Sequence, residues 1–228
     1  MNNVYKRLEK IIGNNNIERL SKVKVLIVGL GGVGGSCFES LVRSKIENIY
    51  VCDFDTFEES NLNRQILSDL SNIGQYKVDV AEKRAKMIND KCNIIKINEK
   101  LNKENINELI PNNIDYIVDA CDDIIVKVEL VKFAINNKIK IISSMGTGNK
   151  LNPQLLEITN IWKTKYDPLA KKFRYYLKKN RINYKLPVVS SVEQPLMKTS
   201  DFVGSFAPVT NTAGLLLSSY VINDIIKK

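Results

Sequence analysis

The chain has 228 residues, of which 44% are hydrophobic and 26% charged, which suits one α/β domain with a packed core and excludes a disordered chain. It has no histidine, and its four cysteines form no C-x-x-C pair, so imidazole-based triads and paired-thiolate zinc sites are excluded. The formal net charge of +9, from 34 basic and 25 acidic residues, can mark a polyanionic partner.

Residues 1–20 are predicted to form an amphipathic N-terminal arm. Leu8, Ile11 and Ile12 recur at helical spacing, and Gly13 with three asparagines ends the pattern. The first residues contain no signal-peptide h-region, and the chain has no run of about 18 apolar residues, so no signal peptide and no contact with a membrane is expected. The expected location is the cytoplasm, where buried thiols stay reduced.

Strands alternate with helices between residues 21 and 150. The predicted strands cover residues 23–28, 48–55, 93–99, 114–121 and 138–146. The predicted helices cover residues 33–44, 75–91 and 124–136. This rhythm predicts a Rossmann-like fold of the α/β class, with a doubly wound, mainly parallel sheet. Ligands of such sheets bind at the carboxyl ends of the strands.

A C-terminal accessory segment is predicted from residue 151 to residue 228, packed on the same domain. Two strands are expected within residues 153–161 and 185–195. A helix is expected after Asp167, which is a suitable N-cap, with Pro168 at the first helical position. Residues 207–227 predict a final helix, whose polar side chains argue against a membrane helix.

The stretch GLGGVGG follows the first strand and opens the first helix. Its glycines, which predict a phosphate-binding turn, are Gly29, Gly31, Gly32 and Gly34. Asp53 lies 24 residues after Gly29, close to the spacing of a ribose-binding acid, although it could instead cap a turn. These residues alone leave open whether the ligand is a nicotinamide dinucleotide or ATP.

The next polar stretch favours ATP. Asn61, Arg64 and Lys77 follow the second strand, and the two cations suit the oxygens of a leaving pyrophosphate, which a dehydrogenase does not need. Asp122 ends the fourth strand and could bind Mg²⁺ beside a triphosphate, or cap the next helix. Ser144, Thr147 and Lys150 lie near the end of the fifth strand, but the sequence pattern assigns no function to them.

The positive charge is concentrated between residues 161 and 185, which contain nine basic residues and one acidic residue. The basic residues predicted to contact nucleic acid are Lys163, Lys165, Lys171, Lys172, Arg174, Lys178, Lys179 and Arg181. Aromatic residues are interleaved with them, as in surfaces that bind phosphates and stack bases. The alternative is a solvated helix face, with Phe173 and Leu177 packed inward.

The stretches GLGGVGG, DFDTFEESNLNRQ, NIGQYK and DACDD together resemble the superfamily of adenylating enzymes that act on ubiquitin-like and sulfur-carrier proteins. The resemblance implies that Gly32, Asp53 and Asp55 lie at the nucleotide and that Asp122 holds Mg²⁺. It gives catalytic roles to Asp122, Arg64 and Lys77, with Asn61 also at the phosphates. It further implies a homodimer in which Arg7 from the arm reaches the partner's site. The second arm arginine of the family falls at Val4, where this chain departs from the pattern.

Residues 143–179, 187–195 and 204–214 resemble one branch, the tRNA threonylcarbamoyladenosine dehydratases. That resemblance implies a tRNA substrate, adenylation of its carboxylate by ATP, and ring closure that releases AMP. A cysteine-desulfurase system is a candidate partner. The alternatives are an adenylating enzyme for a sulfur carrier, a nicotinamide oxidoreductase and an inactive binding module. No cysteine follows Cys121, so a thioester route through the crossover loop is excluded.

Overall fold

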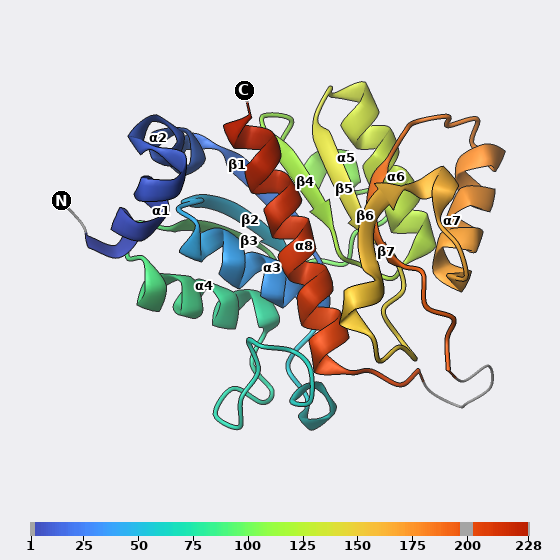
Figure 1. Ribbon diagram of the computed structural model, residues 1–228, viewed down its shortest axis with the longest axis horizontal. Helices are drawn as coiled ribbons and strands as arrows, with labels where there is room; N and C mark the ends of the chain where they lie inside the picture. The colour runs from blue at the N-terminus through green and yellow to red at the C-terminus, as the bar shows by residue number, and fades with distance from the viewer. Residues whose placement is uncertain (1–2, 197–202, 228) are drawn as a thin grey trace.

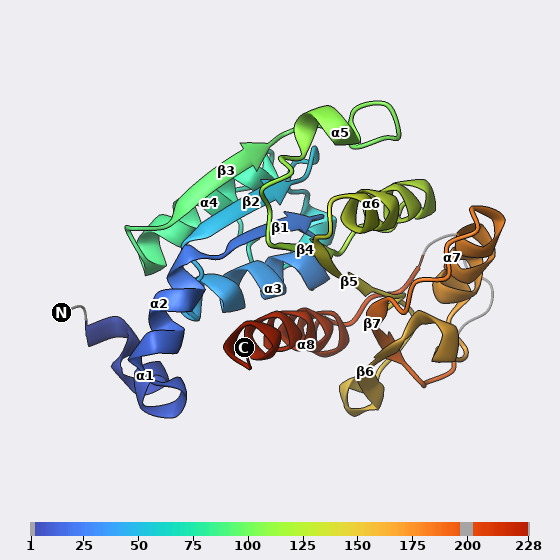
Figure 2. The same ribbon diagram turned by 90° about the horizontal axis from the view of Figure 1, so that it is seen from above.

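The structure is built around one seven-stranded sheet, in a computed structural model that describes residues 3–196 and 203–227. The strands are β1 (Lys24–Val28), β2 (Asn48–Cys52), β3 (Asn93–Ile97), β4 (Tyr116–Asp119), β5 (Lys140–Ser144), β6 (Leu156–Asn160) and β7 (Pro187–Ser191). Their order across the sheet is β3-β2-β1-β4-β5-β7-β6, and neighbours are parallel except β6 and β7 (Figures 1 and 2). The predicted doubly wound, mainly parallel sheet is therefore confirmed.

Helices cover both faces of the sheet. The α-helices are α1 (Lys6–Ile12), α2 (Asn14–Lys22), α3 (Gly32–Arg43), α4 (Lys77–Ile88), α5 (Ile106–Leu109), α6 (Ile124–Asn136), α7 (Pro168–Lys179) and α8 (Ala207–Ile226). Short 3₁₀ turns occupy Asn3–Tyr5, Glu59–Asn61, Pro153–Leu155 and Ile161–Lys163. One apolar core joins the sheet to α3, α4 and α8, and a second joins it to α6 and α7 (Figure 2). Burial on both faces explains why the central strands are near-continuous apolar runs.

The segment that follows residue 150 completes the sheet. β7 extends the parallel order beside β5, and β6 returns antiparallel at the edge. α7 begins at Pro168 as predicted, because Asp167 Oδ1 accepts a hydrogen bond from the Ala170 amide at 2.9 Å. α8 lies along α3 (Figure 1), and in the described residues no helix is long and apolar enough to cross a membrane. Residues 197–202 and 228 of the predicted accessory segment lie outside the described residues.

Two helices form the N-terminal arm, where the sequence predicted one. The asparagines expected to end the first helix form the first turn of α2. α2 belongs to the core, because its Ile17 and Leu20 are buried. In α1, by contrast, no residue is buried, and Ile11 is 80% exposed. Residues 1–2 of the predicted arm lie outside the described range.

Candidate nucleotide-binding site

A cavity of about 1140 Å³ opens at the carboxyl ends of β1, β2, β4 and β5. The predicted nucleotide residues that line it are Gly29, Gly31, Gly32, Asp53, Asp55, Asn61, Arg64, Lys77 and Asp122. They converge because parallel strands end at the same edge of a sheet, beside the point where the strand order reverses. Two predicted residues do not line it: Gly34 lies within α3, and Arg7 is exposed on α1.

The glycines of the turn differ in whether the packing of the chain leaves room for a side chain. Gly29 has φ +90°, and a Cβ there would lie 2.8 Å from the Ala120 carbonyl oxygen. A Cβ on Gly34 would lie 1.8 Å from the Gly29 carbonyl oxygen, so α3 could not pack against the turn. A Cβ on Gly31 would be 4.0 Å from its nearest neighbour, on Gln65. Gly31 is thus not required by the packing of the chain, which fits a backbone that a phosphate approaches closely.

Alanine substitutions should separate the packing of α3, which needs Gly34, from phosphate binding, which needs Gly31. We expect Gly34→Ala to destabilise the fold by about 3 kcal/mol or more, because backbone must move to admit the methyl group. We expect Gly31→Ala to keep the melting temperature of the free protein and to lose most of its affinity for ATP. Thermal unfolding with and without ATP measures both effects. Equal ATP-induced stabilisation of wild type and Gly31→Ala would contradict the assignment.

Asp53 joins the end of β2 to the glycine turn. Its Oδ2 accepts a hydrogen bond from the Leu30 amide at 2.6 Å, and its Oδ1 accepts one from the Asp55 amide at 2.9 Å. Burial raises the pKa of the Asp53 carboxyl, and the nearby Lys77 ammonium is the largest influence that lowers it. Asp53 therefore does cap the turn, the alternative considered from the sequence, and each oxygen keeps a second lone pair for a ribose hydroxyl.

Lys77 is the first residue of α4 and is only 5% exposed. Its Nζ lies 3.0 Å from Asp55 Oδ2 and lines the cavity. A cation in the first turn of a helix opposes the helix dipole, so in the free protein the Asp55 carboxylate offsets that cost. A phosphate in the cavity could take over this role from the exposed Asp55.

Arg64 and Asn61 belong to a loop that is already ordered by its own hydrogen bonds. Arg64 Nη1 donates to the Ser60 carbonyl at 2.7 Å and to Asn63 Oδ1 at 2.9 Å. Asn61 Oδ1 accepts a hydrogen bond from the Glu58 amide at 3.2 Å. Arg64 is half-buried at the cavity wall, and its guanidinium retains further donors for a ligand.

Gln65 is a cavity residue that the sequence analysis did not identify. It is buried, and its Oε1 has no hydrogen-bond partner among the described residues. Buried acceptors are usually paired, so this oxygen fits a donor from a ligand or from water in the cavity. Its position directly after Arg64 in SNLNRQ was the available signal.

Asp122 and Asp123 have separate roles. The helix cap considered for Asp122 belongs to Asp123, whose Oδ1 accepts hydrogen bonds from the Ile125 and Val126 amides at 2.8 and 3.2 Å. That alternative for Asp122 was therefore wrong. The Asp122 carboxylate is exposed at the cavity and forms no hydrogen bond or ion pair within residues 3–196 and 203–227. It fits Mg²⁺, which combines one or two carboxylates with phosphate oxygens and water.

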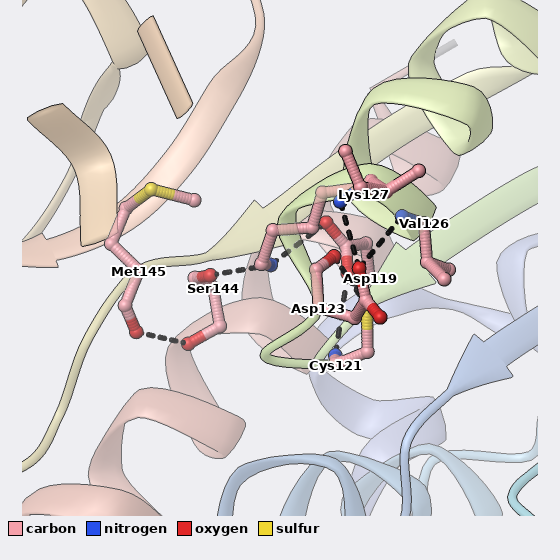
Figure 3. A network of polar contacts seen from close by, with 8 residues as sticks. Asp119, Cys121, Asp123, Val126, Lys127, Ser144 and Met145 are labelled. Carbon is pink, nitrogen blue, oxygen red and sulfur yellow. Dashed lines mark hydrogen bonds and ion pairs between the residues drawn. The ribbon is translucent and has the colours of Figure 1, made fainter. Parts of the chain in front are cut away.

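A buried ion pair behind the cavity was not predicted. Lys127 Nζ lies 2.9 Å from Asp119 Oδ2 and donates to the Ser144 carbonyl at 2.9 Å, and both charged side chains are 0% exposed (Figure 3). Asp119 Oδ1 also accepts hydrogen bonds from the amide and thiol of Cys121. These contacts join the ends of β4 and β5, and so fix the two loops that carry Asp122 and Met145.

The basic segment lies at the opposite end of the molecule from α1 (Figures 1 and 2). Phe173 and Leu177 are buried, as the solvated-helix alternative expected. The predicted tRNA contacts that are exposed are Lys163, Lys165, Lys171, Lys172, Lys178, Lys179 and Arg181. Arg174 differs, because its guanidinium donates to Thr164 and is half-buried. Arg174 thus holds the turn before α7.

Comparison with known proteins extends these observations. Residues 5–228 match the ThiF family. The chain is 34% identical to a tRNA threonylcarbamoyladenosine dehydratase of Bacillus subtilis, over 98% of this chain and 94% of that protein. It is 41% identical to dehydratase 2 of Saccharomyces cerevisiae, over 82% of this chain and 42% of that protein. The crystal structure of the Escherichia coli dehydratase in complex with ATP superposes with a TM-score of 0.92, at 26% identity over 98% of this chain and 93% of that one. The chain belongs to the ThiF family.

Proposed function

We propose that this chain catalyses the ATP-dependent dehydration of threonylcarbamoyladenosine in tRNA, which closes a ring and releases AMP and pyrophosphate. The observation that carries the proposal is the convergence of the glycine turn, Arg64, Lys77 and Asp122 on one cavity. The fold around that cavity is shared with a dehydratase whose crystal structure contains ATP.

ATP is a substrate of the proposed reaction. The carboxylate of the threonylcarbamoyl group attacks the α-phosphorus, pyrophosphate leaves, and an acyl-adenylate forms. The carbamoyl group of the same side chain then displaces AMP and loses a proton. One carboxyl oxygen leaves on AMP, so the nucleoside loses the mass of one water.

The residues contribute charge and position. Lys77 and Arg64 neutralise negative charge on the leaving pyrophosphate, and the amides of the glycine turn hold a phosphate. Asp122 would hold Mg²⁺, which would supply further positive charge beside the phosphate oxygens. Because the second nucleophile belongs to the substrate, proximity replaces a covalent residue. Burial raises the pKa of the Cys121 thiol well above its usual range, in agreement with a reaction that uses no thiolate.

The proposal includes a homodimer in the cytoplasm. Arg7 lies on the exposed helix α1 and does not line the cavity of its own chain, so a role at the phosphates requires a second copy. The cysteines among the described residues are free thiols, as expected in a reducing compartment.

The exposed lysines of the basic segment are proposed to bind tRNA. We expect combined replacement of Lys171, Lys172 and Lys178 by glutamate to weaken tRNA binding strongly and to leave ATP binding unchanged, because these side chains lie outside the cavity. The matched control replaces three exposed lysines outside the basic segment by glutamate, namely Lys83, Lys91 and Lys138. Binding is measured as a function of salt, and the first variant should show a shallower salt dependence. Equal tRNA affinity of the two triple variants would refute this surface.

The function is tested by incubating the protein with ATP, Mg²⁺ and tRNA that carries threonylcarbamoyladenosine. AMP release together with loss of one water from the nucleoside would establish the dehydratase. Pyrophosphate exchange with a carrier protein that ends in Gly-Gly, without AMP from this tRNA, would move the assignment to the sulfur-carrier enzymes.

A further inference from the structure

The cavity is larger than the part lined by the predicted nucleotide residues. Those residues follow β1, β2 and β4, whereas the cavity continues past the end of β5 to the start of α7. This second half of the cavity is lined by residues 144–150 and 166–169, and we call it the β5–α7 half. A second substrate that reacts at the α-phosphate of ATP must enter the cavity from a side that ATP does not fill. The β5–α7 half is such a side.

Lys150 is the only basic side chain among the described residues that line the β5–α7 half. Its side chain is 1% exposed, and its Nζ donates to the Gly146 carbonyl at 2.6 Å. The same Nζ lies 3.4 Å from Asp167 Oδ2. An ammonium has three donors, and the third has no partner among the described residues. One N–H of the amine is therefore not used by the described residues.

The Lys150 ammonium acts on two carboxylates, because it lies beside Asp167 and also lowers the pKa of the buried Glu193 carboxyl. The Asp167 carboxylate is held in place, because its Oδ1 also accepts the hydrogen bond that caps α7, so the Lys150 ammonium beside it is fixed in position. The other buried lysine of the region, Lys127, is different. Its ammonium faces Asp119, the Ser144 carbonyl and the Phe173 ring, and it does not line the cavity.

We propose that the β5–α7 half is the acceptor subsite, in which Lys150 binds the carboxylate of the threonylcarbamoyl group and holds it beside the α-phosphate. The proposal rests on the proposed function, which supplies an acceptor with a carboxylate. Charge-assisted hydrogen bonds from an ammonium to a carboxylate are short and strong, so they orient the nucleophile as well as bind it. Tyr166, which is 56% exposed and lines the same half, offers a ring for the attached base.

The test compares two forms of one tRNA in the presence of a non-hydrolysable ATP analogue. One form carries threonylcarbamoyladenosine, and the other is a transcript with unmodified adenosine. We expect wild type to prefer the modified form by about tenfold or more. Lys150→Gln should abolish that preference, with the affinities for the unmodified tRNA and for the ATP analogue unchanged. Lys91→Gln, which removes an exposed lysine far from the cavity, should behave as wild type.

A charge-conserving variant separates binding from folding. Lys150→Arg should retain most of the preference for the modified tRNA. The proposal is overturned if Lys150→Gln keeps the preference, if wild type shows none, or if both Lys150 variants lose the ATP analogue, which would make the residue structural. Failure of the proposed function looks different: wild type would then release no AMP with the modified tRNA.

Discussion

Replacing Lys77 by methionine is expected to lower kcat/KM for AMP formation by about a hundredfold to a thousandfold. Lys77 presents a positive charge to the cavity, and its burial limits screening by water. A charge that acts on the developing pyrophosphate cannot be replaced by an unbranched apolar side chain of similar shape. AMP release from tRNA that carries threonylcarbamoyladenosine measures the loss.

The Lys77→Met variant should also change the pH dependence. Burial raises the pKa of the Asp53 carboxyl, and Lys77 is the main influence that opposes this rise. Removal of the ammonium therefore raises that pKa further. Asp53 then takes up a proton at higher pH, so the acid limb of the activity profile shifts upward.

Two controls define the role of Lys77. Lys83→Met removes an exposed lysine from the same helix and should leave activity unchanged. Asp55→Asn removes the carboxylate that pairs with Lys77 and should have a much smaller effect than Lys77→Met, because the ammonium remains. A Lys77→Met enzyme within threefold of wild type would show that Lys77 only stabilises the free protein.

The sheet and most of its flanking helices could be predicted because their signals are local. Apolar runs, helical spacing and the Asp167–Pro168 cap each lie within one short stretch. The convergence of Asp53, Asp55 and Asp122 followed from a topological rule, since residues at the carboxyl ends of parallel strands meet. Whether each residue contacts ATP stays a prediction, although its place in the cavity is observed.

What could not be predicted depends on distant partners or on small energetic differences. Asp122 and Asp123 are adjacent acids, and only the backbone at the start of α6 decides that Asp123 caps the helix. α2 begins at an asparagine after Gly13, where the sequence pattern also fits a loop. Lys150 meets Asp167 across 17 residues, so no local pattern reveals that its ammonium is buried.

The second large effect concerns Lys127, whose ion pair with Asp119 is fully buried. We expect Lys127→Met to lower the free energy of unfolding by about 3–5 kcal/mol, because it leaves the Asp119 charge buried without its partner. For a chain of this length such a loss lowers the melting temperature by on the order of 10 °C. Denaturant unfolding at fixed pH measures the change. Lys132→Met on the same helix, which removes a partly exposed ion pair with Glu129, should cost about 0.5 kcal/mol or less.

A double variant distinguishes burial of charge from loss of packing. If the cost of Lys127→Met arises from the unpaired Asp119, then Asp119→Leu combined with Lys127→Met should be more stable than Lys127→Met alone. Additive losses would instead assign the cost to packing around both side chains. The double variant should still release less AMP than wild type, because the hydrogen bonds that Cys121 donates to Asp119 and that Lys127 donates to the Ser144 carbonyl fix the loops on both sides of the cavity. The role of the buried Lys127–Asp119 pair would then be to position two loops. It would hold Asp122 in a fixed place relative to the β5–α7 half.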